Sequence, residues 1–316
     1  MEIRQRYARI IAKEKFVVND KTLSDEKGKK VRKIWRWLLW GGIVLLPKKW
    51  VSRGVGALVR IPLPQVLIRG WIGAFSKLYG VNWEEVEVPE EGFRTFLEFF
   101  TRPLKPNARP ISELPLVLPC DGKIYQKGNL QEQRSFWVKG SKYTLEDLLG
   151  ETPEHEFHKG WAITVYLSPK DYHRVHSPAD VEVKRVSYLP GERWPVNPLA
   201  LEHVPNLFAR NERVAVWLQT TKGLSLALIM VGALNVGSIR LYFDENFSPA
   251  STKKSWEYSG VFLRKGEALG CFEMGSTVIL VGPPAWELRE DLEEGDTVKM
   301  GEGLGQQAIQ KNDTKT

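Results

Sequence analysis

The sequence contains little of what several protein classes require. Its 316 residues include only two cysteines, Cys120 and Cys271, which are too few for a disulfide framework and lack the spacing of a metal site. We expect both to be reduced thiols in a cytosolic setting. Phosphate-binding loops, G-x-S-x-G elbows, H-E-x-x-H motifs and dinucleotide fingerprints are all absent, which argues against conventional nucleotide-dependent and zinc-dependent enzymes. The GEGLG segment at 301–305 is interpreted as a turn.

Basic charge is concentrated at the N-terminus. Residues 1–70 carry 17 Lys or Arg against 5 Asp or Glu, whereas the remainder carries 28 basic and 33 acidic residues. Within the basic part, the uncharged stretch 37–47 has only about half the ~20 residues of a membrane-spanning helix. Tryptophans and basic residues surround it and recur in 58–80, a mixture typical of helices that lie in the lipid headgroup layer. The pattern favours contact with an anionic membrane surface over binding to nucleic acid.

The chain divides into three parts. We predict a polar leader over 1–32, a basic amphipathic helical region over 33–100, and a β-rich catalytic domain over 101–316. The apolar spacing predicts a helix over 90–100, three prolines predict an extended linker after it, and a short helix is expected over 144–150. Short β-rich segments then recur about every ten residues, which predicts a mostly antiparallel β sandwich or barrel within an α+β fold.

Three segments carry candidate chemistry. SPKDYHRVHSP (168–178) holds His173 and His176, two of only five histidines in the chain. LPCDGKI (118–124) holds Asp121, which reads as turn chemistry unless a nucleophile is near. FEMGSTVILVGPP (272–284) places Gly275 and Ser276 before an apolar strand. We expect Gly275 to allow a strained backbone that exposes its carbonyl to attack by the Ser276 hydroxyl.

These segments, in this order, resemble the prokaryotic type of phosphatidylserine decarboxylase. The resemblance extends over about residues 35–305 and includes FFTRPLKPNARPI, YLSPKDYHRVHSP, VPNLFARNERV, VGALNVGSI and KGEALGCFEMGSTVIL. It implies a proenzyme that cuts itself between Gly275 and Ser276. The products are a β chain of residues 1–275 and an α chain of residues 276–316, whose first residue becomes a pyruvoyl group.

The resemblance also implies roles for individual residues. Ser276 attacks the Gly275 carbonyl, His176 activates Ser276, and Asp121 orients His176, in the manner of a Ser-His-Asp triad. His173 corresponds to a substrate-contacting or proton-handling residue. The pyruvate-derived cofactor binds the substrate amine as a Schiff base and acts as an electron sink. No metal is required.

The implied activity is decarboxylation of phosphatidylserine to phosphatidylethanolamine in phospholipid biosynthesis. The expected partners are phosphatidylserine in an anionic membrane and the α and β chains of one precursor, with a homodimer compatible and nucleic acid excluded. The expected location is peripheral, on the cytoplasmic face of the cell (inner) membrane. The family usually has leucine where Met274 stands, and we expect this volume-conserving change to preserve processing.

Other functions remain open at this point. A paralogous pyruvoyl-dependent decarboxylase would carry the same cut but act on another amino-acid headgroup or a soluble amine acid. A membrane-associated Ser-His-Asp hydrolase would instead keep Ser276 as a free nucleophile in an intact chain. A lipid-surface binding module would be insensitive to Asp121→Asn in both chain length and binding.

Overall fold

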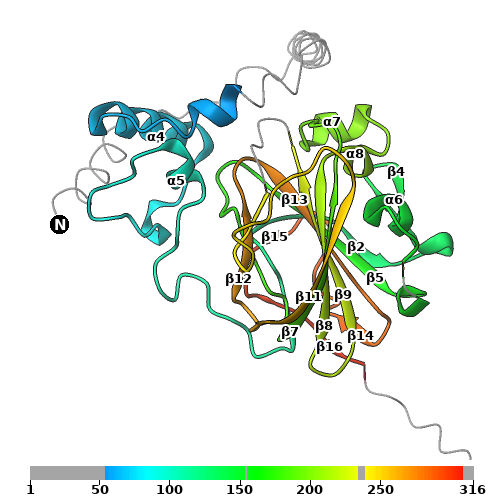
Figure 1. The fold of residues 1–316 in the computed structure, drawn as a ribbon. Helices are drawn as coiled ribbons and strands as arrows, with labels where there is room; N and C mark the ends of the chain where they lie inside the picture. The colour runs from blue at the N-terminus through cyan, green and yellow to red at the C-terminus, as the bar shows by residue number, and fades with distance from the viewer. Residues whose placement is uncertain (1–53, 154, 234–238, 309–316) are drawn as a thin grey trace, which may run out of the picture.

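A computed structural model describes residues 54–153, 155–233 and 239–308. The predicted polar leader at 1–32 and the first part of the amphipathic region lie outside these described residues. Two parts are visible in Figure 1: a small helical part formed by the N-terminal residues, and a larger β-rich part. An extended segment joins them, as the prolines after Phe100 predict.

The helical part is built around α4 (Gln65–Tyr79), η1 (Trp83–Glu85) and α5 (Phe96–Phe100). Helix α4 follows Pro64 and ends at Gly80, which adopts a left-handed conformation and donates its N–H to the Ser76 carbonyl. Left-handed glycine is a common helix stop because it has no Cβ to clash. Across the described ranges, no helix is long and apolar enough to cross a membrane.

The helix predicted over 90–100 is shorter than its apolar spacing suggested. Only Phe96–Phe100 is helical, beginning at a capping box in which Thr95 and Glu98 satisfy each other's backbone N–H groups. The preceding residues form a turn with Gly92 at a φ of 78°. The aromatic residues of α5 nevertheless pack inward as predicted, against Ile68 and Ile72 of α4.

The β-rich part contains one open eight-stranded sheet in which every neighbouring pair is antiparallel. This confirms the predicted mostly antiparallel α+β fold. It is not a closed barrel: among the described residues, the two outer strands of the sheet have no pairing with each other. In spatial order the strands are β11 (Lys254–Leu263), β7 (Val181–Leu189), β8 (Arg213–Thr220), β9 (Ser225–Gly232), β13 (Ser276–Gly282), β5 (Trp161–Leu167), β2 (Gly122–Asn129) and β15 (Thr297–Val298).

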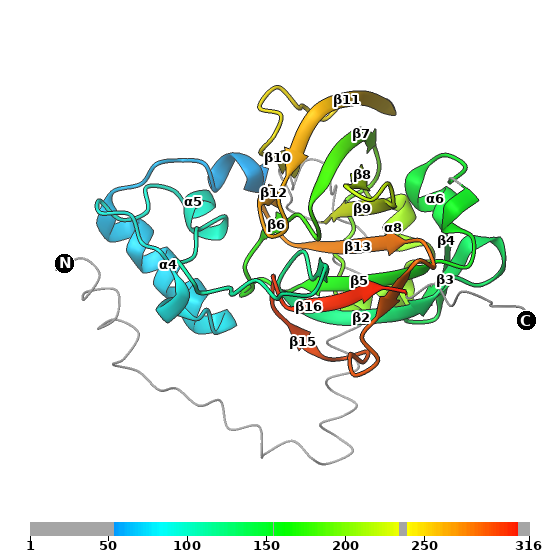
Figure 2. The same ribbon diagram turned by 90° about the horizontal axis from the view of Figure 1, so that it is seen from below.

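Both faces of this sheet are covered (Figure 2). Two three-stranded sheets pack on the first face: β10 (Ile239–Leu241), β12 (Ala268–Phe272) and β6 (Arg174–His176), and then β1 (Leu116–Val117), β16 (Gly303–Gln307) and β14 (Trp286–Leu288). The second face carries β3 (Ser135–Val138), β4 (Ser141–Thr144), α6 (Leu145–Leu149), α7 (Pro198–His203) and α8 (Leu207–Arg210). Short 3-10 turns, η2 (Glu132–Arg134) and η3 (His155–Phe157), complete the order.

Burial on both faces explains the sequence of the central strands. Every residue of β13 is buried, with Val278 and Leu280 in the core of the first face and Ile279 in that of the second. Such strands read as continuous apolar runs, without the alternation of a half-exposed antiparallel strand. The short helix predicted over 144–150 is confirmed as α6, capped by Thr144 and Gly150. GEGLG is a turn only at its start, because Gly303–Gly305 belong to β16.

Candidate active site

Ser276 is the first residue of β13 and lies between two neighbouring strands. Its Cα is paired with Leu167 of β5 and with Gly232 of β9. The side chain is fully buried and shares the sheet face of Val278. Among the described residues, its Oγ has no hydrogen-bond partner. A buried hydroxyl without a partner is uncommon because its desolvation is not compensated, which makes this group a candidate for chemistry.

The three residues before Ser276 form a loop that contacts the helical part. Met274 is half-buried and packs against the cores of both parts, and Glu273 forms an ion pair with Arg60. Gly275 corrects one expectation, because it is not among the residues with positive φ and therefore stores no left-handed strain. A Cβ built on Gly275 would meet no described atom within 4 Å, so the Gly275 peptide is sterically open.

His176 lies on β6, which packs over the same face of the sheet to which Ser276 and Val278 belong. Its Nδ1 is 2.8 Å from the Gly266 carbonyl oxygen, and its Nε2 is 3.0 Å from the Tyr172 hydroxyl. Because a carbonyl can only accept, Nδ1 carries the proton and Nε2 accepts from Tyr172. Burial lowers the pKa of His176, with a smaller opposing contribution from the charge of Asp121. The neutral imidazole therefore has its lone pair on Nε2.

Asp121 is buried immediately before β2. Its carboxylate accepts a bifurcated hydrogen bond from Arg109 Nε, 2.9 Å from Oδ1 and 3.2 Å from Oδ2, one from Arg109 Nη2 at 2.5 Å, and one from the Met300 N–H at 2.9 Å. The next residue, Gly122, is required by close approach and not by a turn. A Cβ there would lie 2.4 Å from the Tyr166 carbonyl oxygen. Asp121 is thus held in place as a charged group.

His173 is completely buried three residues before His176. Its Nδ1 lies 2.9 Å from the Asp171 carbonyl oxygen and must donate to it, whereas its Nε2 has no partner among residues 54–153, 155–233 and 239–308. The ring packs on Phe100 with centroids 4.1 Å apart. Burial, with a contribution from the nearby Arg102 charge, lowers the pKa of His173 to about 3. At neutral pH this side chain is a base with an unoccupied lone pair.

The fold brings Asp121 and Ser276 to the same end of neighbouring strands. Lys123 of β2 and Thr277 of β13 are both paired with Tyr166 of β5. Asp121 and Ser276, just before them, therefore lie about two interstrand spacings, or roughly 10 Å, apart. The His176 N–H also donates to the Pro119 carbonyl at 2.8 Å, two residues before Asp121.

The predicted triad is not joined by hydrogen bonds in this structure. Asp121 bonds to Arg109 and Met300, and His176 bonds to Gly266 and Tyr172, so Asp121 acts on His176 through its charge. Sequence reasoning missed Tyr172 and Arg109. Tyr172 stands inside the same histidine-rich segment, and its proximity to His176 was the available signal.

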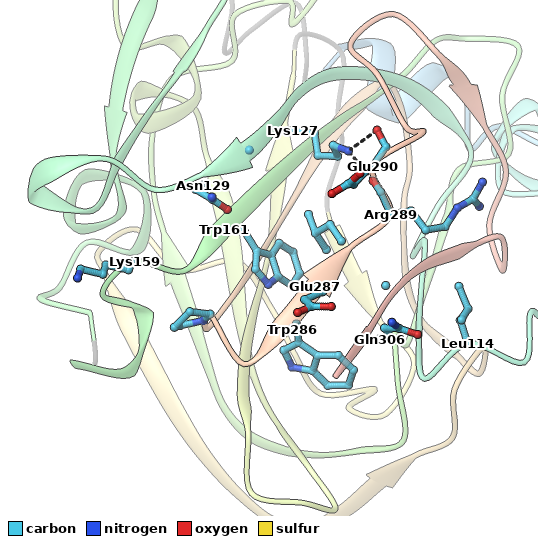
Figure 3. A pocket seen from close by; sticks show the side chains of 14 residues that line it. Leu114, Lys127, Asn129, Lys159, Trp161, Trp286, Glu287, Arg289, Glu290 and Gln306 are labelled. Atoms are coloured by element: carbon cyan, nitrogen blue, oxygen red, sulfur yellow. Dashed lines mark hydrogen bonds between the residues drawn. The ribbon is translucent and has the colours of Figure 1, made fainter. Parts of the chain in front are cut away.

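A cavity on the β-rich part contains none of the predicted residues. This cavity of about 740 Å³ is lined by Trp161, Trp286, Glu287 and Lys127, among others (Figure 3). Lys127 Nζ is already held by the Arg289 carbonyl at 2.5 Å. We assign it no part in the chemistry below.

Comparisons with known proteins identify similar chains. A model of the family described as phosphatidylserine decarboxylase matches residues 96–306. The phosphatidylserine decarboxylase proenzyme of Myxococcus xanthus is 39% identical over 269 residues, which cover 83% of this chain and 95% of the relative. The proenzyme of Marinobacter nauticus is 41% identical over 271 residues, covering 82% and 94%. That of Glaesserella parasuis is 42% identical over 247 residues, covering 74% and 83%.

Proposed function

The chain belongs to the phosphatidylserine decarboxylase family, and from this premise we propose that it decarboxylates phosphatidylserine to phosphatidylethanolamine and CO2. The cofactor is a pyruvoyl group made from its own Ser276. The observation that supports this most directly is the fully buried Ser276 hydroxyl, which has no hydrogen-bond partner within the described ranges and follows a Gly275 whose Cβ position is open. The relatives' description as proenzymes agrees with processing at such a residue.

Self-cleavage begins with attack of Ser276 Oγ on the Gly275 carbonyl carbon. The C–N bond breaks, the freed nitrogen takes up a proton, and Gly275 is left as an ester on Oγ. Elimination then releases the Gly275 carboxylate. Water replaces the nitrogen, which leaves as ammonia, and residue 276 becomes a pyruvoyl group at the start of the α chain, 276–316. Its carbonyl supplies the site for the substrate amine and the electron sink for decarboxylation.

His176 serves as the base that takes the Ser276 proton. It is neutral at physiological pH because burial lowers its pKa, and Nε2 carries the lone pair. The Tyr172 hydroxyl donates a hydrogen bond to this lone pair, and Ser276 replaces Tyr172 as the donor when self-cleavage begins. Asp121, fixed by Arg109, stabilises the imidazolium that forms when the proton arrives.

His173 handles the proton of the decarboxylation itself. Among the described residues its Nε2 has no partner, and it is unprotonated at neutral pH. A pKa of about 3 makes it too weak a base to deprotonate an ammonium, so the substrate amine loses that proton to water. His173 Nε2 then accepts a hydrogen bond from the neutral amine and takes up, transiently, the proton that the nitrogen loses on attacking the carbonyl. After CO2 leaves, the same nitrogen returns the proton to the carbon that carried the carboxylate. One proton is taken and one is given back.

Helix α4 supplies the contact with the membrane. Its buried face packs on α5, yet Val66 is 82% exposed and Leu78 76% exposed, close to Arg69 and Lys77. Exposed apolar side chains beside basic ones are typical of a helix in the interfacial plane of an anionic bilayer. We place the protein peripherally on the cytoplasmic face of the cell membrane. The homodimer stays a prediction.

Intact-protein mass spectrometry tests the cofactor. Wild type should give two chains, with the smaller beginning at position 276 and having the mass of a pyruvoyl N-terminus. Ser276→Ala and His176→Ala should each give one uncut chain without CO2 release from phosphatidylserine vesicles. Thr277→Val is the matched control, because Thr277 is also buried and its hydroxyl also has no partner among the described residues, and it should be cut normally. A single full-length wild-type mass, with Ser276 acylated by a serine-directed reagent, would favour the hydrolase.

Sedimentation with vesicles tests the membrane contact. Val66→Asp and Leu78→Asp should each weaken binding to phosphatidylserine-containing vesicles by about tenfold, since each removes an apolar anchor and adds a repelled charge. Phe262→Asp is the matched control, because Phe262 is 69% exposed but lies on β11. Equal losses in all three variants would contradict docking through α4.

A further inference from the structure

A small cavity separates the helical part from the β-rich part. Its volume is about 180 Å³, below the roughly 300–1,000 Å³ of pockets that hold drug-sized ligands. The end of α4 and η1 contribute Gly80, Asn82 and Glu85, and the linker contributes Arg102 and Arg109. The remaining wall includes Asp121, Lys170, Asp171, Tyr172 and Lys299.

Most charges around this cavity neutralise one another. Arg109 bonds to both Glu85 and Asp121, and Lys299 bonds to Glu85 at 2.9 Å. Arg102 is different, because its hydrogen bonds go only to backbone carbonyls. Its Nη2 donates to the carbonyl oxygens of Lys170 at 2.7 Å and Asp171 at 3.2 Å, and its Nη1 lies 3.5 Å from that of Phe99.

Arg102 is also incompletely satisfied. Only 3% of the residue is exposed, and its Nε has no partner in the part of the chain that the structure describes. Arg213 shows what a purely structural arginine looks like here: all three of its nitrogens donate to carbonyls, at 2.6 to 3.0 Å. A buried guanidinium without a bonded carboxylate and with a nitrogen left over is costly unless an anion completes it. Burial lowers the pKa of Arg102 only to about 10, so it stays charged.

The cavity adjoins the catalytic residues. The Asp171 carbonyl that accepts from Arg102 also accepts from His173 Nδ1. Tyr172, the hydrogen-bond donor to His176, lies in the same wall as Asp121. An anion bound by Arg102 would therefore lie near His173, the imidazole assigned to proton handling, because both side chains donate to the same carbonyl. It would also lie beside the end of the helix that we propose contacts lipid.

We propose that Arg102, assisted by Lys170 at the rim, forms the subsite for an anionic group of the lipid headgroup, either its phosphate or its carboxylate. The subsite rests on the proposed function, and it names the residues that recognise the substrate. A planar arginine fork suits both oxyanions. The small volume admits a headgroup and leaves the acyl chains outside, in the membrane that α4 contacts.

Calorimetric titration at low salt tests the subsite, with the processed protein in which both chains, 1–275 and 276–316, are present in full. The probes are sn-glycerol 3-phosphate, which offers a phosphate, and D-glycerate, which offers a carboxylate and has no amine to react with a carbonyl. At least one should bind, and the one that does identifies the group recognised. Arg102→Lys keeps the charge but loses the fork, and should weaken that binding at least tenfold. Arg213→Lys is the matched buried control and should leave it unchanged.

Lys170→Gln keeps the test decisive if Arg102→Lys does not fold, because Lys170 is exposed. It should weaken binding about threefold at low salt, and added salt should reduce that difference. Absence of binding by both probes, or equal affinity in wild type and in the folded Arg102 or Lys170 variant, would overturn the subsite. The readout needs no turnover, so loss of the pyruvoyl mass in the same samples would count against the proposed function separately.

Discussion

Acidification should destabilise this protein through His173. An unfolded histidine has a pKa near 6.5, whereas burial holds that of His173 at about 3. Between these values the unfolded chain binds a proton that the folded chain cannot, so stability present above pH 6.5 is lost as the pH falls. Each pH unit costs about 1.4 kcal/mol, which gives about 2 kcal/mol from this residue between pH 6.5 and pH 5.

The assay compares two uncut proteins by urea denaturation at pH 7, 6 and 5. Ser276→Ala is the parent, since it keeps the chain whole, and His173→Asn is added to it. The asparagine amide can still donate to the Asp171 carbonyl, as Nδ1 does, but it does not titrate. The free energy of unfolding should fall less steeply in the double variant, by about 2 kcal/mol over this range.

The comparison isolates one residue. His176, whose pKa is also lowered by burial, contributes in the same direction in both proteins and cancels, as do the carboxyl groups. Parallel pH dependences in the two proteins would refute the reasoning, because they would mean that His173 takes up its proton inside the fold. It would then lack the free lone pair that the proposed proton transfer uses.

Three further outcomes are expected. Tyr172→Phe removes a donor that favours neutral His176, a hydrogen bond of about 1 kcal/mol or about fivefold in the protonation equilibrium. On the acid side, the self-cleavage rate measured in cell-free synthesis should therefore begin to fall at a higher pH, while cleavage at pH 7.5 is retained. Loss of cleavage at pH 7.5 would contradict the view that Tyr172 only positions His176. Gly122→Ala should prevent folding or lower stability by more than about 3 kcal/mol in thermal unfolding, since Cβ would meet the Tyr166 carbonyl at 2.4 Å. Met274→Leu should leave the cleavage half-time within about threefold by pulse-chase, and a larger change would give methionine a specific role.

Much of the fold could be predicted from local patterns. Helix α6 has its cap residues, Thr144 and Gly150, at both ends, and the linker after Phe100 has its prolines. The helix over 90–100 was predicted too long because apolar spacing does not reveal that Gly92 turns the chain. Strand order could not be predicted, since β13 pairs with β5 and β9, both far from it in sequence. Those contacts depend on burial of both sheet faces, which short motifs do not encode.

The candidate site also has features that could be predicted from the sequence and features that could not. Asp121, His173, His176 and Ser276 stand in distinctive segments and could be singled out from the sequence. Their hydrogen bonds could not, because each involves a partner fixed by tertiary packing. Asp121 is bonded by Arg109 from the linker and by Met300 from near the C-terminus. The triad implied by the resemblance therefore names residues whose hydrogen bonds in this structure go to other partners.

The loop at which we propose self-cleavage contacts both parts of the protein. Met274 packs against the aromatic cluster under α4 and against the core of the β-rich part, and Glu273 is ion-paired with Arg60. The bond between Gly275 and Ser276 thus lies one to three residues from contacts with the region that we assign to the membrane. Because cores are close-packed and transmit displacement, docking of α4 should also position this loop. On the proposed function, the helical part therefore has two roles besides membrane contact: it forms one wall of the cavity that we propose for the headgroup, and it supports the peptide that we propose as the source of the cofactor.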